Sequence, residues 1–219
     1  MLGGLPKELS ARLLAAQRTI TLREGEILFE RGDAGNGCYW LRRGVLAVAV
    51  ASEKGEHRTL AILGAGAIVG ELAMIDGLPR SATVQALRDC VLSFISRAAF
   101  SELMSRHPEL SSDLVTTLAA RLRQSDEDMV ASTFLTVRAR VARALLAFAV
   151  HLGEEVAPGR IRIRHKITHN DLAAMAGVAR ESVSRTVSGW TKQKVLEGSS
   201  RSGYVVHHAR LEREAAASE

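Results

Sequence analysis

Residues 70–84 read GELAMIDGLPRSATV, and this stretch decides how the first half of the chain is interpreted. Glu71 stands at the head of a short apolar run, and Arg80 follows nine residues later, directly before Ser81. Gly77 and Pro79 lie between them and mark a bend. An exposed turn with a solvated ion pair is one explanation. The alternative is a site for a ligand that carries both hydroxyl groups and a negative charge.

The segments around this stretch have the composition of β-strands. Between Thr19 and Ile95, short runs rich in Val, Ile, Leu and aromatic residues are separated by glycines, with a turn about every eight to twelve residues. This spacing predicts a compact antiparallel β-roll, built as a barrel or sandwich. A helix is expected on each side of the roll, at residues 5–17 and 100–107, and the second must end before Pro108.

A long helix is predicted next, because residues 109–137 contain neither glycine nor proline. Its apolar residues recur at three- and four-residue steps on one narrow stripe, which comprises Leu114, Leu118, Leu122 and Met129, with Ser125 between the last two. Such a stripe is typical of a coiled-coil seam. The seam would make the protein a homodimer, with the hydroxyl of Ser125 close to the two-fold axis. Packing of the stripe against the chain's own roll is the alternative.

Charge is distributed unevenly along the 219 residues. Residues 1–135 contain 15 Lys and Arg against 16 Asp and Glu, whereas residues 136–210 contain 13 against 5. The basic part indicates a polyanionic partner such as nucleic acid, although its charge could also serve only to solubilise a small domain.

Targeting and redox features point to one compartment. Cys38 and Cys90 are far apart in the sequence and suit a reducing environment. The N-terminus has no signal-peptide pattern, and the most apolar stretch is too short to span a membrane. A cytoplasmic protein with no membrane contact is therefore expected.

Residues 168–190, THNDLAAMAGVARESVSRTVSGW, have the spacing of a helix-turn-helix. Thr168 and Asp171 can form a capping box at the first helix, Gly177 makes the turn, and the second helix is expected from about Arg180 to Lys194. The side chains expected to reach DNA are Thr168, Arg180, Glu181, Ser184, Arg185 and Ser188.

The chemistry of the second helix favours DNA over an ordinary exposed ion pair. Arginine can donate twice to guanine, and glutamate can accept from the cytosine amine. Phosphates would repel Glu181, so its place is at base edges.

The segments around the helix-turn-helix complete a winged domain. Residues 136–152 predict an amphipathic helix, GEEVAPGR at residues 153–160 a loop, and RIRIRHKI at residues 160–167 a short strand. EGSSRSGYVVHH at residues 197–208 predicts a hairpin that forms a wing near the phosphate backbone. The chain is thus divided into an α+β set of three parts, with the roll and its flanking helices at residues 1–107, the long helix at 108–135 and the winged domain at 136–219.

In this order, the three parts resemble the bacterial cyclic AMP receptor protein family of transcription regulators over nearly the whole chain. The motifs G-E-L and R-S-A resemble the phosphate-binding cassette of cyclic-nucleotide-binding domains. The resemblance implies that Glu71 accepts a hydrogen bond from the ribose 2′-hydroxyl and that Arg80 pairs with the cyclic phosphate. Ser81 would add its hydroxyl and backbone N–H, and Gly70 and Leu72 would contribute backbone contacts.

The same resemblance, aligned on FLTV at residues 134–137, places the base-contacting pair at Ser125 and Asp126. An ionised Asp126 only accepts hydrogen bonds, so it suits the adenine amine or the N1–H and amino group of guanine equally, or it faces solvent in its acidic run. The resemblance implies cAMP as the allosteric ligand, with cGMP as the alternative.

On the DNA side, Arg180, Glu181 and Arg185 match the family member that reads palindromic TGTGA-type sites, whereas Ser188 replaces a lysine of that family. RNA polymerase is an expected partner at the loop EEVAPGR, beside double-stranded DNA and a second copy of the chain.

Other functions remain as alternatives. A regulator that needs no nucleotide would keep the fold, and a regulatory subunit of an effector enzyme would keep the cassette alone. No paired-carboxylate, nucleophile–base or metal-ligand spacing is found, so neither enzymatic activity nor a metal, haem or iron–sulfur cofactor is expected.

Overall fold

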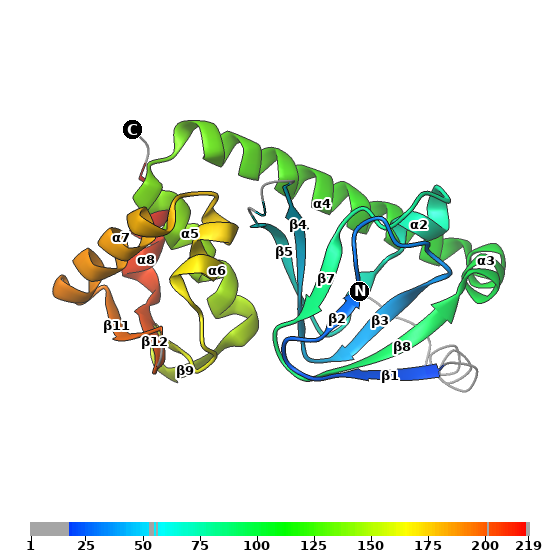
Figure 1. The fold of residues 1–219 in the computed structure, drawn as a ribbon, viewed down its shortest axis with the longest axis horizontal. Helices are drawn as coiled ribbons and strands as arrows, with labels where there is room; N and C mark the ends of the chain where they lie inside the picture. Colours follow the sequence, from blue (N-terminus) through cyan, green and yellow to red (C-terminus); the bar gives the residue numbers. More distant parts are fainter. Residues whose placement is uncertain (1–17, 53–54, 56, 201, 218–219) are drawn as a thin grey trace. The chain divides into compact units, whose positions relative to one another are not determined.

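The computed structural model describes residues 18–217 apart from residues 53, 54, 56 and 201 (Figure 1). The helix expected at residues 5–17 lies outside the described residues. The chain separates into two compact units, one made of residues up to 50 together with 61–122, the other of residues 51–60 together with 123–219. The long helix α4 (Pro108–Phe134) contributes to both, and each unit is described by itself.

The first unit is an antiparallel β-roll, as its sequence predicts. It contains two four-stranded sheets, with strand orders β1-β8-β3-β6 and β2-β7-β4-β5. The strands are β1 (Arg18–Leu22), β2 (Ile27–Phe29), β3 (Gly37–Arg43), β4 (Val45–Ala51), β5 (His57–Gly64), β6 (Ile68–Val69), β7 (Thr83–Ala86) and β8 (Cys90–Ser96).

One core lies between the two sheets because alternate strand residues point inward. Leu41 and Leu92 come from the first sheet and Leu46 and Val84 from the second, and all four belong to one fully buried cluster. Antiparallel pairing places Leu41 opposite Leu92 on β3 and β8. The roll therefore provides a rigid frame for the loop between β6 and β7, which carries the cassette residues.

Two short helices flank this loop. Helix α2 (Leu72–Ile75) lies inside the cassette, and α3 (Arg97–Arg106) follows β8. Helix α3 begins earlier than the pattern of residues 100–107 predicts, because the side chain of Ser96 caps it by accepting a hydrogen bond from the Ala99 N–H at 3.2 Å.

Helix α4 forms without interruption, as predicted, but its apolar stripe is divided. Leu114 packs against a buried cluster of the roll that includes Cys38 and Phe100. A different row stays exposed, namely Val115, Leu122 and Met129, whose side chains are 65%, 64% and 68% exposed and recur every seven residues. The sequence pattern merged these two faces, since both have leucine or methionine at helical spacing.

The second unit is a winged helix-turn-helix built on helix α5 (Val137–Leu152). Its other helices are α6 (His169–Ala176), α7 (Arg180–Lys192) and α8 (His208–Ala215). Its sheet has the order β11-β12-β10-β9, from β9 (Gly153–Ala157), β10 (Arg160–Ile163), β11 (Leu196–Ser199) and β12 (Gly203–His207). The core includes Leu145, Trp190, Tyr204 and Leu211, all fully buried.

The hairpin β11–β12 confirms the predicted wing, whereas the loop predicted for GEEVAPGR is wrong. Residues 153–157 form strand β9, which pairs with β10 so that Glu155 lies opposite Ile161. Glycine and glutamate have low β-propensity, so the segment carries no local strand signal. The ladder to β10 imposes the strand, and the left-handed Gly159 (φ 69°) closes the hairpin.

Candidate functional site

Arg80 is a buried cation that has no anionic partner in the described part of the chain. Its side chain is only 4% exposed, and it donates hydrogen bonds of 2.7 Å to the carbonyl oxygens of Gly70 and Gly37. Its guanidinium lies 4.3 Å above the Phe29 ring, and its Nε makes no hydrogen bond. Among the residues that the structure describes, none forms an ion pair with it. A buried charge in this state is costly, and an anion would relieve it.

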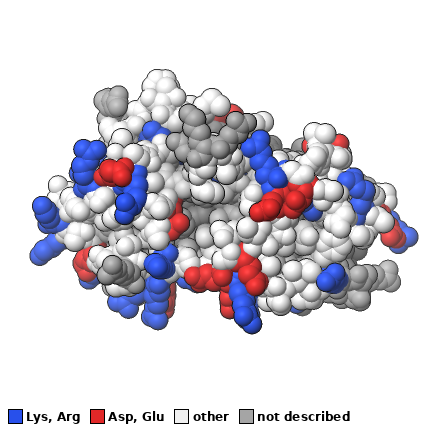
Figure 2. Space-filling model, viewed as in Figure 1, with Lys and Arg blue, Asp and Glu red and all other residues white. Residues whose placement is uncertain are grey.

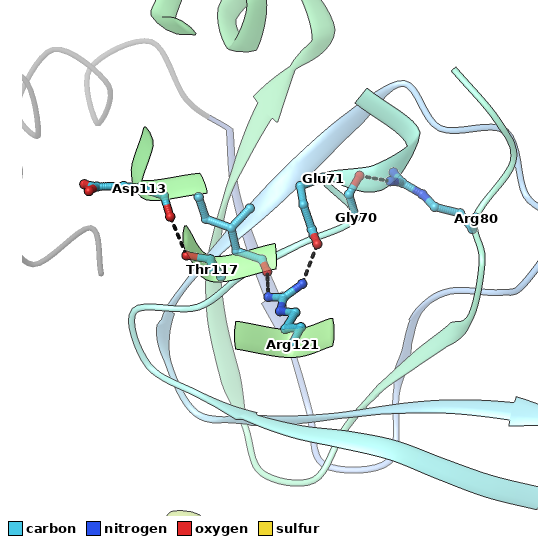
Figure 3. Close-up of polar contacts among 7 residues, drawn as sticks. Gly70, Glu71, Arg80, Asp113, Thr117 and Arg121 are labelled. Carbon is cyan, nitrogen blue, oxygen red and sulfur yellow. Dashed lines mark hydrogen bonds and ion pairs between the residues drawn. The ribbon is translucent and has the colours of Figure 1, made fainter. Parts of the chain in front are cut away.

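The backbone around Gly70 is shaped for this arginine. Gly70 has a φ of 81°, which favours glycine, and a Cβ built at this position would stand 2.4 Å from the Arg80 Nη1. The glycine is therefore required both by the turn and by the close approach of the guanidinium (Figure 3).

Glu71, the acid of the same motif, already has a cationic partner. It is 3% exposed, and Arg121 of α4 donates to its carboxylate, while a second nitrogen of Arg121 donates to the Ile68 carbonyl at 2.7 Å (Figure 3). The two residues are fifty positions apart, and nothing in the local sequence of either one signals the contact. Arg121 is thus a site residue that the sequence analysis missed.

Arg97 is a second residue that the sequence analysis missed. Its guanidinium donates to the carbonyls of Ala73 at 2.8 Å and Gly35 at 3.2 Å, and more weakly to Met74 at 3.4 Å. These carbonyls belong to α2 and to the turn before β3, so Arg97 fixes the helix of the cassette to the roll. Its position at the start of α3 could have suggested only a surface cation.

The buried thiol of Cys38 lies near both charged residues of the cassette. The pKa of Cys38 is raised to about 12, chiefly by burial and also by nearby Glu71, while nearby Arg80 opposes the shift. A thiol with such a raised pKa stays neutral and adds no charge of its own. In these low-polarity surroundings, the charges of Glu71 and Arg80 are screened less than they would be in water.

The remaining cassette residues lie at the surface. Leu72 begins α2 and is 40% exposed, and Ser81 is exposed directly after Arg80. The structure therefore brings Gly70, Glu71 and Arg80 together, with Leu72 and Ser81 at their edge.

The predicted base-contacting residues lie further along α4. Ser125 and Asp126 are exposed, and Ser125 follows Arg121 by four residues, on the same face of the helix. They belong to the second unit, so their approach to the cassette stays a prediction.

The predicted helix-turn-helix is present with its caps. The Thr168 hydroxyl accepts from the Asp171 N–H at 3.1 Å, and the Asp171 carboxylate accepts from the Thr168 N–H at 2.7 Å. Gly177 ends α6 in the left-handed conformation (φ 62°), as the turn requires. The box fixes the first helix, so Thr168 has a structural role besides any contact with DNA.

Helix α7 has a buried face and a polar face. Val183, Val187 and Trp190 are buried against the unit's core, as predicted for the two valines. The five predicted DNA-contacting residues of this helix lie on the other side, with Ser184 half-buried and Arg180, Glu181, Arg185 and Ser188 exposed.

Charge on this helix is available to a partner. Among the described residues, none forms an ion pair with Arg180, Glu181 or Arg185, although Arg185 donates to the Ser182 hydroxyl at 3.4 Å. Figure 2 shows Lys and Arg side chains standing out from the surface of this unit. The arrangement suits base edges flanked by phosphates.

Within the described part of the chain, no helix is long and apolar enough to cross a membrane. No group of three or more His, Cys, Asp and Glu residues is placed to hold a metal ion in residues 18–217, outside the four positions left undescribed.

Comparisons with known families agree with these two sites. Residues 19–107 match the family of cyclic nucleotide-binding domains, and residues 139–214 match the Crp-like helix-turn-helix domain. The first match contains the whole cassette, and the second contains α6, α7 and the wing.

Curated relatives extend over most of the chain. A cyclic AMP receptor protein of Thermus thermophilus is 33% identical over 89% of this chain and 86% of its own length. A CRP-like cAMP-activated global transcriptional regulator of Mycobacterium tuberculosis is 27% identical over 90% and 88% of the two chains. Among solved structures, a c-di-GMP responsive global regulator of Xanthomonas campestris has the same fold, with a TM-score of 0.80 and 20% identity over 92% of this chain and 99% of its own.

Proposed function

This chain is a cyclic-nucleotide-binding transcription regulator of the CRP/FNR superfamily, and we propose that it acts as a cAMP-responsive homodimer on palindromic TGTGA-type DNA sites. The proposal begins from the buried cation of the cassette. Two alternatives keep the fold, namely a response to cGMP and a regulator that needs no nucleotide. A regulatory subunit of an effector enzyme does not account for the second family match.

The single observation that supports a nucleotide ligand is the burial of Arg80 without an ion pair among the described residues. The side chain is 96% buried, and its guanidinium plane can present two parallel N–H groups to two phosphate oxygens. A cyclic phosphate carries one negative charge on two such oxygens. Ser81, exposed beside it, would add its hydroxyl and backbone N–H, and Gly70 and Leu72 would add backbone contacts.

The sugar would be held by Glu71. Its carboxylate is buried and accepts a hydrogen bond from Arg121, and its oxygens can also accept one from the ribose 2′-hydroxyl. Arg121 donates to the same carboxylate and would stay beside the ligand. The acid and the base of the cassette thus bind different parts of one nucleotide.

The purine would be read by Ser125 and Asp126. A hydroxyl and an ionised carboxylate can accept from the adenine amine, and the carboxylate suits guanine as well. We favour cAMP because the curated relatives are named for cAMP, and cGMP is the competitor to be tested.

The DNA contacts would come from α7. Arg180 and Arg185 would donate to guanines, Glu181 would accept from cytosine, and Ser184 and Ser188 would lie nearer the phosphates, with Thr168 at the start of α6. Arg180 and Glu181 are exposed and form no ion pair with another described residue, which supports this assignment.

Dimerisation would use the exposed row of α4. Val115, Leu122 and Met129 recur every seven residues, which is the repeat of a two-stranded coiled coil. A homodimer would present two copies of α7 about one turn of DNA apart, on the order of 34 Å. We place the regulator in the cytoplasm with its DNA, and RNA polymerase as a partner at the β9–β10 hairpin.

Calorimetry with cAMP and cGMP side by side tests the ligand. We compare the wild type, Arg80→Leu and the matched control Arg42→Leu, which removes the same charge from an exposed position of β3. The proposal expects cAMP to bind wild type and control alike and to lose its affinity for Arg80→Leu. Equal binding by all three proteins would refute the assignment of the cassette. Tighter binding of cGMP than of cAMP would make cGMP the ligand.

A gel-shift titration tests the DNA part. A duplex with two TGTGA half-sites competes against excess duplex with scrambled half-sites, with and without nucleotide, in rising salt. Binding through base contacts survives the competitor, whereas binding through charge alone collapses with salt. Equal specific binding with and without nucleotide would favour the regulator that needs no ligand.

A further inference from the structure

Helix α8 follows the wing and has no part in the function proposed above. It packs on α5 through the fully buried Leu211, and Glu214 lies on the same face one turn further along. Glu212, between them, points to solvent. One face of this short helix is therefore committed to the core of the winged unit.

Glu214 forms a two-pronged pair with Arg138 of α5. The Arg138 Nε donates to one carboxylate oxygen at 3.0 Å and an Nη donates to the other at 2.8 Å. The side chain of Glu214 is 22% exposed. The hydrogen bonds from Arg138 lower the pKa of Glu214, and the nearby indole N–H of Trp190 contributes, although its geometry falls outside that of a hydrogen bond. The carboxylate is charged at neutral pH.

Arg138 also reaches the C-terminal end of α7. Its Nη donates to the side-chain oxygen of Gln193, the cap residue directly after α7, at 3.3 Å. Its guanidinium lies 5.6 Å from the centre of the Trp190 ring on the same helix. Glu214 holds this guanidinium in the orientation in which it contacts Gln193 and Trp190.

A second contact joins α8 to the short segment that follows α7. Arg210 donates to the Lys194 carbonyl at 3.2 Å. Lys194 has a φ of 56° and is the one non-glycine residue with positive φ in the described part of the chain. This conformation costs about 1 kcal/mol, so it persists where neighbours hold the chain.

We propose that Arg138 and Glu214 are positioning residues for DNA reading, which tie the C-terminal end of α7 to α5 and α8. The proposal rests on the DNA contacts assigned above to the other end of α7. With 13 residues, α7 is about 20 Å long. A tilt of about 5° at its anchored end moves Arg180 and Glu181 by nearly 2 Å, which exceeds the tolerance of a hydrogen bond.

The test compares Glu214→Gln with Glu212→Gln. Both variants remove one negative charge from α8, but the exposed carboxylate of Glu212 pairs within α8, with His208 at 3.4 Å. Fluorescence anisotropy measures the affinity for a TGTGA duplex and for a scrambled duplex, and mass spectrometry measures hydrogen exchange in α7. Arg138→Lys is the second variant, since a lysine keeps the charge but cannot make two parallel hydrogen bonds.

Glu214→Gln is expected to bind the TGTGA duplex about tenfold more weakly than Glu212→Gln, the effect of one charge-assisted hydrogen bond. The scrambled duplex should bind both equally, and α7 should exchange faster in Glu214→Gln and in Arg138→Lys.

Two results would overturn the positioning role of Arg138 and Glu214, and a third separates this role from the proposed DNA site. Equal specific affinity and equal exchange in the two glutamine variants would overturn the positioning role. If affinity for both duplexes falls equally and the helical circular dichroism signal is lost, Arg138 and Glu214 stabilise the fold and do not position α7 for DNA reading. If the wild type does not discriminate the duplexes, the proposed DNA site fails, and the exchange of α7 alone decides whether the anchor exists.

Discussion

Replacing Arg80 with leucine separates the binding of the phosphate from the stability of the roll. In the structure, the arginine donates to two carbonyls and stacks on Phe29, with no carboxylate to neutralise it among the described residues. The nucleotide would gain two charge-assisted hydrogen bonds from this group, each worth about 1.5–3 kcal/mol. Their loss raises Kd by roughly 10²- to 10⁴-fold.

Two opposing effects keep the unliganded variant folded. The carbonyls of Gly70 and Gly37 lose a donor, at a cost of about 1–3 kcal/mol each. Removing a buried cation that lacks an ion pair returns several kcal/mol, and leucine fills part of the volume on Phe29. The net change in the free energy of unfolding is therefore small compared with the loss of ligand binding.

Thermal unfolding with and without cAMP measures both quantities. At a ligand concentration 100 times the wild-type Kd, the wild type and the control Arg42→Leu should each gain about 2.7 kcal/mol, while Arg80→Leu should gain at most about 0.4 kcal/mol. The reasoning is wrong if Arg80→Leu keeps the cAMP-dependent rise in Tm. It is also wrong if the unliganded variant unfolds several kcal/mol more easily, because the arginine would then serve the fold and not the ligand.

Three further predictions concern other contacts. Arg121→Met should lower the unfolding free energy of the first unit by about 1–3 kcal/mol relative to Arg123→Met in denaturant titrations, because it leaves the buried carboxylate of Glu71 without its cation, although Arg121 itself is 36% exposed. Met129→Asp should convert a dimer into a monomer at micromolar concentration in sedimentation velocity; an unchanged sedimentation coefficient would exclude the α4 seam. The pKa of Glu214 is lowered below its ordinary value of 4.5, so its contribution to stability is present above about pH 4.5 and is lost as the pH falls through the lowered value. Stability measured between pH 6 and pH 3 should therefore fall less steeply in Glu214→Gln than in the wild type.

Local sequence determines the parts of this molecule that the sequence analysis predicted. The capping box of Thr168 and Asp171 and the left-handed Gly177 are contacts within a few residues, and they appear as predicted. The cassette also lies within one loop, so Gly70, Glu71 and Arg80 keep their spacing when the roll forms.

Contacts between distant segments were missed for a common reason. The partner of Glu71 comes from fifty residues further along, and any exposed arginine of a long helix would look the same in the sequence. Strand β9 exists because β10 pairs with it, and α8 is held by Leu211 and by the Glu214 pair with α5, not by helix propensity alone.

The two charged residues of the cassette differ in what a ligand must displace. At Arg80 the proposed phosphate would meet a guanidinium whose hydrogen bonds, among the described residues, go to neutral carbonyls, so pairing would gain an ionic contact without breaking one. At Glu71 the proposed ribose hydroxyl would have to share the carboxylate with Arg121, so the sugar contact would add little net free energy and would instead change how firmly α4 is tied to the loop. A ligand can shift a conformational equilibrium only by its difference in affinity between two states. In the proposed complex, the phosphate would therefore provide most of the affinity, whereas the sugar contact, through Arg121, is where binding would act on the helix that leads to the DNA-binding unit.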